Sequence, residues 1–135
     1  YNKPVVIHNR EATNDTYEIL KDYPELKKDI HCYSGSLEMA KNFIKLNCRL
    51  GIGGVVTFKN SKLKDVLKEI DLKYLMLETD SPFLTPEPYR GKQNEPYNII
   101  YVAKTLSEIK GISLEEVLKQ TTLNAIDQFN LKIKL

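Results

Sequence analysis

Tyr74-Leu75-Met76-Leu77-Glu78-Thr79-Asp80-Ser81-Pro82 is an apolar run that ends in two carboxylates and a proline. Read as a strand, it alternates its side chains between two faces, so Met76, Glu78 and Asp80 share one face. Pro82 cannot extend a hydrogen-bonded ladder, and the strand is expected to stop before it. Two carboxylates on one face of a buried strand are costly unless they are paired or bind a cation. Parallel α/β enzymes build active sites where strands open into loops, whereas the structural alternative is a carboxylate that caps a backbone amide.

The only two histidines of the chain occupy the same kind of position. His8 ends the apolar run that begins at residue 4, and His31 follows the short segment 29–30. A single histidine at a strand end is more often structural than a ligand. Two histidines and Asp80 at the same end of successive strands favour a metal site instead, because imidazole and carboxylate together suit zinc or a similar divalent ion.

Strand and helix patterns alternate along the whole chain. They predict strands over residues 4–8, near 30, over 50–58 and over 74–78. They predict helices over 15–21 and 37–46, from 61, over 94–111, from 113 and over 122–129. The expected helix signals are N-caps at Ser36, Asn94 and Ser113 and a helix end at Gly111. Strands that alternate with helices pair in parallel, so we expect one α/β domain over 1–135, half of a TIM-type (β/α)8 barrel.

Composition narrows the class of protein. The 135 residues are 41% hydrophobic, which supports a packed core in about one domain. The net charge of +2 does not by itself indicate a nucleic-acid binder. No apolar stretch approaches the roughly 20 residues of a membrane span, so no membrane partner is expected. Two cysteines are too few for a disulfide scaffold, and we expect free thiols in a cytoplasmic protein.

Candidate phosphate contacts follow the strand ends. The irregular stretch 81–93 precedes a helix and carries Arg90, a planar fork for phosphate, and Lys92, a point charge. Ser34 also lies just before a helix, where hydroxyl and amide groups hold oxyanions. Arg10 lies two residues past His8 and is a candidate to orient a ligand or phosphate. The alternatives are a solvated loop for the two cations, helix capping near Ser34 and a surface salt bridge for Arg10.

The glycines of Gly51-Ile52-Gly53-Gly54 resemble a dinucleotide fingerprint only superficially. A third glycine would be needed at position 56, which is Val56. We interpret the glycines as letting the backbone approach a ligand or a neighbouring strand closely. Tight packing in a barrel wall is the alternative explanation.

Four segments in order resemble the TatD family of metal-dependent deoxyribonucleases. They are residues 4–12 (PVVIHNREA), 31–36 (HCYSGS), 78–82 (ETDSP) and 88–96 (PYRGKQNEP), followed by 121–125 (TTLNA). The family is similar to amidohydrolase-type barrels and hydrolyses phosphodiester bonds in DNA with divalent metals. The resemblance implies that His8, His31 and Asp80 are metal ligands, that Asp80 also helps to activate water, and that DNA is the substrate. The metal would be zinc, magnesium or manganese.

The position of the two acids along their strand suggests different roles. Asp80 lies nearer the loop, so we expect it to reach the metal as ligand and catalytic group. Glu78 lies one layer deeper and is expected to support neighbouring side chains by hydrogen bonds. In the scheme that the resemblance implies, His8 and His31 hold one metal and Asp80 holds the other, while Arg90, Lys92 and Ser34 steady phosphate oxygens.

The chain also departs from the family pattern. The His-x-His pair of the family's first strand and its bridging glutamate are absent, and only three of six usual ligands are present. We therefore expect this chain to be a fragment, the C-terminal half of the barrel, that is weak or inactive alone although the complete protein is a nuclease. Two alternatives stay open. A related hydrolase would act on an ester or amide such as an aminoacyl-tRNA. An inactive half-barrel would self-associate, because an open parallel sheet leaves two unpaired edges.

Overall fold

The sheet contains four parallel strands in the order β1-β2-β3-β4. In this computed structural model, which describes residues 1–133, the strands are β1 (Val5–Ile7), β2 (Lys28–Ile30), β3 (Cys48–Ile52) and β4 (Leu75–Leu77). Ile30, Leu50 and Leu75 lie opposite one another in the register and are at most 1% exposed. This row of apolar side chains forms the centre of the core on one face of the sheet. The predicted α/β fold with parallel strands is confirmed.

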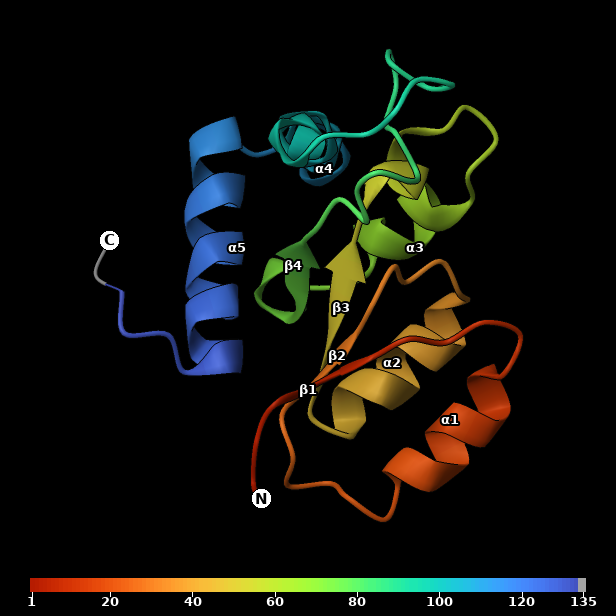
Figure 1. Cartoon of the computed structure of the whole chain (residues 1–135), viewed down its shortest axis with the longest axis vertical. Coiled ribbons are helices and arrows are strands. Elements are labelled where there is room, and N and C mark those ends of the chain that lie inside the picture. Colours follow the sequence, from red (N-terminus) through yellow and green to blue (C-terminus); the bar gives the residue numbers. More distant parts are fainter. Residues whose placement is uncertain (134–135) are drawn as a thin grey trace.

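Each strand connects to the next through helical segments, which is why neighbouring strands run parallel. The α-helices are α1 (Thr13–Leu20), α2 (Leu37–Lys45), α3 (Leu63–Lys68), α4 (Ile99–Lys110) and α5 (Leu114–Phe129). Figure 1 shows α1, α2 and α3 on one side of the strands, while α5 runs beside β4 on the other side. The helix α2 packs against β3, and α5 packs against β4 and α4. Among residues 1–133, no helix is both long and apolar enough to span a membrane.

Two predicted helix caps are confirmed, and the third is wrong. Ser36 and Ser113 each accept a hydrogen bond from the amide three residues ahead, at 3.2 and 3.1 Å. Gly111 ends α4 in the left-handed conformation, with a φ of 64°. Asn94 instead donates to the carbonyl oxygens of Thr79 and Phe83, at 2.8 and 2.7 Å. It therefore holds the loop after β4, and a 3-10 helix (Pro96–Asn98) precedes α4.

The third strand is shorter than predicted. β3 ends at Ile52, and residues Gly54–Thr57 form a 3-10 turn although two of them are valines. The cause is a close crossing, because a Cβ atom at Gly54 would overlap the carbonyl oxygen of Leu84. The Thr57 hydroxyl closes the turn by donating to the Gly54 carbonyl at 2.7 Å. Tertiary packing of the 84–86 loop thus outweighs the strand preference of the valines.

The C-terminal helix is longer than predicted. Residues from 113 and from 122 were expected to lie in separate helices, but α5 is continuous over both. Thr121 does not interrupt it, because its hydroxyl donates to the Val117 carbonyl one turn earlier at 2.8 Å. One uninterrupted helix therefore packs along β4.

Candidate metal centre

The candidate centre lies where β2 and β4 end, on the two sides of β3. His31 directly follows β2, and Glu78 directly follows β4. The ends of parallel strands meet at one edge of a sheet, so side chains 47 residues apart in sequence come into contact. The structure brings together His31, Glu78 and Asp80, three of the residues that the sequence singled out.

The imidazole of His31 lies between two carboxylates. Its Nδ1 atom is 3.0 Å from Glu78 Oε2, and its Nε2 atom is 3.1 Å from Asp80 Oδ1. The other oxygen of Glu78 accepts a hydrogen bond from the Cys32 amide at 2.7 Å. Glu78 therefore fixes both the ring of His31 and the backbone that follows it.

The turn at the end of β4 aims Asp80 at His31. Asp80 has a φ of 55°, a left-handed conformation that costs energy for a residue with a side chain. The turn is held on both sides: the Phe83 amide donates to the Asp80 carbonyl at 2.8 Å, and Asn94 donates to the Thr79 carbonyl at 2.8 Å. The buried amide of Asn94 thus stabilises the backbone that presents the carboxylate.

The charges of this cluster interact strongly. Burial by itself would lower the pKa of His31, but Glu78 and then Asp80 outweigh burial and raise the pKa. Asp29, on β2, is only 5% exposed, and its Oδ1 atom has no hydrogen-bond partner among residues 1–133. Burial first and the charge of Glu78 second raise the pKa of Asp29 to about 7. The two carboxylates that flank the imidazole, Glu78 and Asp80, carry more negative charge than one imidazolium can balance, which favours a cation.

The raised pKa of Asp29 predicts a pH-dependent stability in the metal-free protein. Folded Asp29 keeps its proton up to about pH 7, whereas the unfolded chain releases it near the ordinary aspartate pKa of 3.8. The folded state therefore binds more protons between these pH values, so its stability is full below about pH 4 and declines as pH rises through 7. The decline attributable to Asp29 is up to about 4 kcal/mol. Thermal melts in chelator from pH 4 to 8 should show it, and Asp29→Asn should flatten most of it.

His31 contributes to the same slope with the same sign, because its pKa is also raised on folding. The Asp29→Asn variant should therefore keep the smaller decline that belongs to His31. A wild-type slope that Asn at position 29 leaves unchanged would contradict the assignment to Asp29.

The donor set fits a divalent cation. Ligand atoms of His31, Cys32 and Asp80 lie within 4.8 Å of one another. Two ligands bound tetrahedrally to one zinc at about 2.1 Å would lie about 3.4 Å apart, close to the 3.1 Å between His31 Nε2 and Asp80 Oδ1. Glu78 on the opposite ring nitrogen is the partner that metal-binding histidines commonly have. His31 and Asp80 are thus the residues best placed to hold a metal.

Cys32 was not singled out as a candidate by the sequence, although its position directly after His31 was the available signal. Burial first, followed by Glu78 and Asp80, raises the pKa of its thiol far above the ordinary range. A protonated thiol is a poor ligand. Cys32 and Cys48 are both free thiols.

The other candidate residues lie at different distances from this centre. The exposed ring of His8 is adjacent to that of His31, with 5.9 Å between ring centroids, but His8 is outside the group of potential ligand atoms. Arg10 and Ser34 line one cavity of about 320 Å³ together with His31. The structure therefore brings these two phosphate candidates next to the centre.

The two cations of the 81–93 loop contact aromatic rings instead. The Arg90 guanidinium lies 4.1 Å from the centroid of the Phe58 ring, and the Lys92 ammonium lies 5.6 Å from that of Tyr89. Both cations are exposed. Neither cation forms an ion pair or hydrogen bond with His31, Glu78 or Asp80, so the structure does not bring these two phosphate candidates to the centre.

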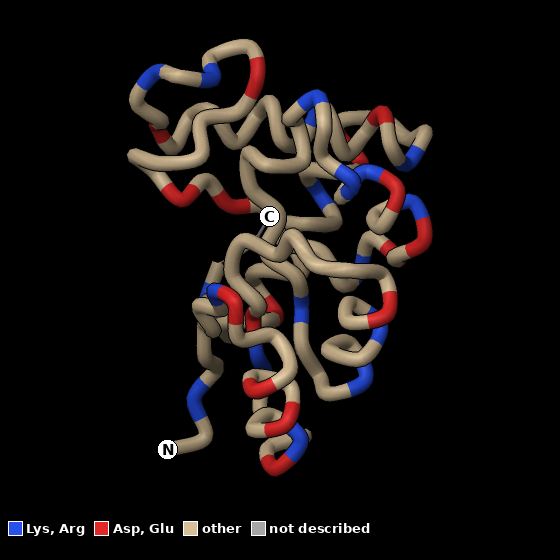
Figure 2. Tube along the Cα trace, turned by 90° about the vertical axis from the view of Figure 1, so that its right-hand side faces the viewer, with Lys and Arg blue, Asp and Glu red and all other residues tan. Residues whose placement is uncertain are grey.

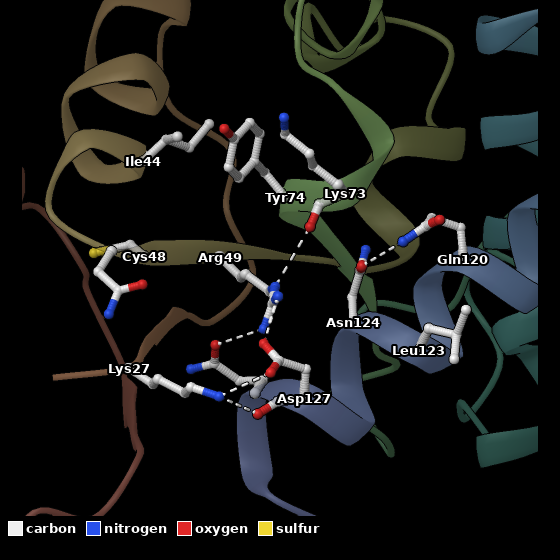
Figure 3. Close-up of a pocket in the computed structure, with 12 residues that line it drawn as sticks. Lys27, Ile44, Cys48, Arg49, Lys73, Tyr74, Gln120, Leu123, Asn124 and Asp127 are labelled. Atoms are coloured by element: carbon white, nitrogen blue, oxygen red, sulfur yellow. Dashed lines mark hydrogen bonds and ion pairs between the residues drawn. The ribbon is translucent and has the colours of Figure 1, made fainter. Parts of the chain in front are cut away.

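A second cavity, of about 490 Å³, lies at the opposite ends of the strands (Figure 3). Lys27 and Arg49 point toward Asp127 of α5, with N–O distances of 3.0 and 2.7 Å. The two hydrogen-bonded cations lower the pKa of Asp127. Lys27, Arg49 and Asp127 thus hold α5 against the sheet, so the chemistry of the protein is expected at the other end.

Comparisons with known proteins agree with this arrangement. The sequence model of the family described as TatD related DNase matches residues 1–130. The uncharacterized metal-dependent hydrolase YabD of Bacillus subtilis is 47% identical over 133 residues, which are 96% of this chain and 52% of YabD. The uncharacterized metal-dependent hydrolase YcfH of Escherichia coli K12 is 36% identical, over 96% of this chain and 50% of YcfH.

Solved structures show the same correspondence. The TatD homolog YJJV of Escherichia coli K12 superposes with a TM-score of 0.88 at 30% identity, over 95% of this chain and 50% of that one. A TatD family hydrolase of Entamoeba histolytica superposes with a TM-score of 0.82 at 26% identity, over 93% of this chain and 50% of the other chain. The chain spans about half the length of the curated relatives it matches. The predicted fold, half of a TIM-type barrel, is confirmed by the parallel sheet and this coverage.

Proposed function

The chain belongs to the TatD related DNase family, and from this premise we propose that it supplies half of a metal-dependent hydrolase that cleaves phosphodiester bonds in DNA. The observation that carries the proposal is the imidazole of His31 between Glu78 and Asp80, at 3.0 and 3.1 Å. This is a preorganised nitrogen and oxygen pair at the carboxyl ends of parallel strands, where barrel enzymes place their chemistry.

His31 and Asp80 would hold the metal, with His8 beside them as a further ligand. When bound, a divalent ion supplies Lewis-acid chemistry: it lowers the pKa of a water molecule and polarises a phosphoryl oxygen. The carboxylate of Glu78 can only accept a hydrogen bond from His31 Nδ1, so the imidazole carries its proton on Nδ1. The Nε2 atom is then left to face the cation. Asp80 has a second oxygen that accepts the proton of the attacking water, which makes it the catalytic residue.

Phosphate binding depends on a few local cations. Figure 2 shows basic and acidic residues interspersed along the trace rather than gathered in one basic face. Arg10 and Ser34 line the cavity that His31 also lines, which supports the proposal that they hold the scissile phosphate. Arg90 and Lys92 would contact the DNA backbone further out. The chain carries three of the six ligands expected for the family, so the complete protein is the form expected to be active.

Cleavage of a DNA oligonucleotide by the complete protein tests the proposal. Activity should disappear in chelator, return with divalent metal, and fall with salt as phosphate contacts are screened. Arg10→Ala should raise KM several-fold and reduce the slope of log(kcat/KM) against log[salt] by about one unit or less. Lys41→Ala, which removes an exposed cation from α2, is the matched control and should change neither quantity.

A rival substrate would be recognised in the same assay series. Turnover of a simple carboxylic ester or of an aminoacyl-tRNA, together with undetectable cleavage of DNA, would overturn the assignment to DNA. The proposal of a metal-dependent hydrolase would then still hold, but with a different substrate.

A further inference from the structure

Gly51 lies on β3 at the middle of the candidate centre. It pairs with Met76 of β4, and its carbonyl oxygen accepts a hydrogen bond from the Tyr33 amide, just past the end of β2, at 2.8 Å. Its φ is not positive; among residues 1–133 only Gly91 and Gly111 are glycines with positive φ. Backbone conformation is therefore not the reason for a glycine at position 51.

Position 51 requires a glycine because there is no room for a side chain. A Cβ atom at Gly51 would overlap the Oε2 atom of Glu78 and would lie 2.9 Å from the Glu78 carboxyl carbon. The Oδ1 atom of Asp29 lies 3.2 Å from the same point. The volume that a side chain on β3 would fill is thus filled by the carboxylate that comes from the end of β4.

We propose that Gly51 is a positioning residue of the metal site, because its missing side chain lets Glu78 cross β3 and hold His31 on the far side. The inference rests on the proposed function, in that His31 and Asp80 bind the metal. Glu78 and His31 lie on opposite sides of the middle strand, and any side chain at position 51 would stand between them.

The effect of a side chain at position 51 depends on the groups that surround the space. The end of Glu78 is flexible, so the side chain would yield rather than the backbone, and the cost in folding stability would be limited to the hydrogen bonds that Glu78 loses. Asp29 occupies the other side of the gap, so the displaced carboxylate would move away from β2. His31 Nδ1 and the Cys32 amide would then lose the acceptor they share.

The neighbouring glycine supplies a matched control. A Cβ atom at Gly53 would lie 3.7 Å from Cys32 Sγ and 3.7 Å from Glu78 Cγ, which are ordinary van der Waals contacts. Gly53→Ala therefore adds the same methyl group, two residues further along the chain, without displacing the carboxylate.

Affinity for Zn²⁺, measured by competition with a chromophoric chelator on the complete protein, tests the inference, with metal-free melting temperatures as the second readout. Gly51→Ala should weaken binding about tenfold, the lower end of what losing a partner behind a histidine ligand costs, and should lower the metal-free melting temperature no more than Glu78→Ala does. Gly53→Ala should stay within about twofold of wild type. In a Glu78→Ala background, Gly51→Ala should cause no further loss, because it acts through Glu78.

Each other result overturns the inference or its premise. Wild-type affinity in Gly51→Ala, or a loss that persists in the Glu78→Ala background, shows that Gly51 does not position Glu78. If His31→Ala also keeps wild-type affinity, the metal site itself is wrong, and the proposed function fails with it. Loss in His31→Ala together with full affinity in Gly51→Ala removes this inference alone.

Discussion

Asp80→Asn is expected to lower metal affinity and DNA cleavage in the complete protein by at least a hundredfold, with little change in melting temperature. An amide is neutral, so it binds a hard cation poorly and cannot accept the proton of an attacking water. The fold should tolerate the change. Asparagine has nearly the same shape and adopts the left-handed backbone that position 80 requires. The carbonyl of residue 80 still accepts from the Phe83 amide.

The measurement is a pair of titrations, Zn²⁺ affinity and kcat/KM on an oligonucleotide, made beside a melting curve. Asp65→Asn is the matched control, because Asp65 is an exposed acid of α3 whose ion pair is with Lys68. It loses the same charge at an exposed position whose partner lies on the same helix, and should keep wild-type affinity and turnover. An active Asp80→Asn protein would show that the carboxylate is not a ligand.

The sequence predicts those residues of the candidate site that lie directly after the ends of strands. His31 and Asp80 each follow an apolar run, and parallel pairing brings such residues to one edge. The same logic placed Glu78 and Asp80 on one face, and both carboxylates do contact His31. These inferences needed only the alternation of side chains along a strand and the parallel order of the sheet.

What the sequence did not predict depends on contacts between distant segments. The end of β3 was misplaced, because the crossing of the loop at Leu84 over Gly54 cannot be read from a run of valines. The sequence around Asn94 predicts a helix cap, whereas its amide holds the loop after β4. Asp29 was not considered, because its proximity to Glu78 follows from the register of three strands. Local sequence patterns therefore predict which helices and strands form, whereas contacts between distant segments decide where those helices and strands end.

Glu78→Gln should have a smaller effect on the metal and a different effect on pH dependence. Zn²⁺ affinity is expected to fall about 10- to 100-fold, as for other groups that hold a histidine ligand, and so less than in Asp80→Asn. A glutamine presents an amide N–H as readily as a carbonyl to His31 Nδ1. The ring is then no longer held with its proton on that nitrogen, and Nε2 is less available to a cation.

The melting temperature should separate the two functions of Glu78. Near pH 5, Asp29 is protonated in both proteins, and the variant loses only a charged acceptor for His31 and the Cys32 amide, so it melts lower than wild type. Near pH 8, the wild type also carries the repulsion between ionised Asp29 and Glu78, which the variant lacks. The gap between the two melting temperatures should therefore narrow as pH rises from 5 to 8.

The sign of this change follows from the pKa shifts. Glu78 raises the pKa of both Asp29 and His31, and a raised pKa gives stability at low pH that is lost as pH rises through it. Removing the charge of Glu78 lowers both pKa values, so the variant should lose less stability over this range. Melts in chelator at pH 5, 6, 7 and 8 measure it directly. A gap that widens with pH would mean that Glu78 does not face Asp29 across Gly51, and the crossing of β3 by its carboxylate would have to be abandoned.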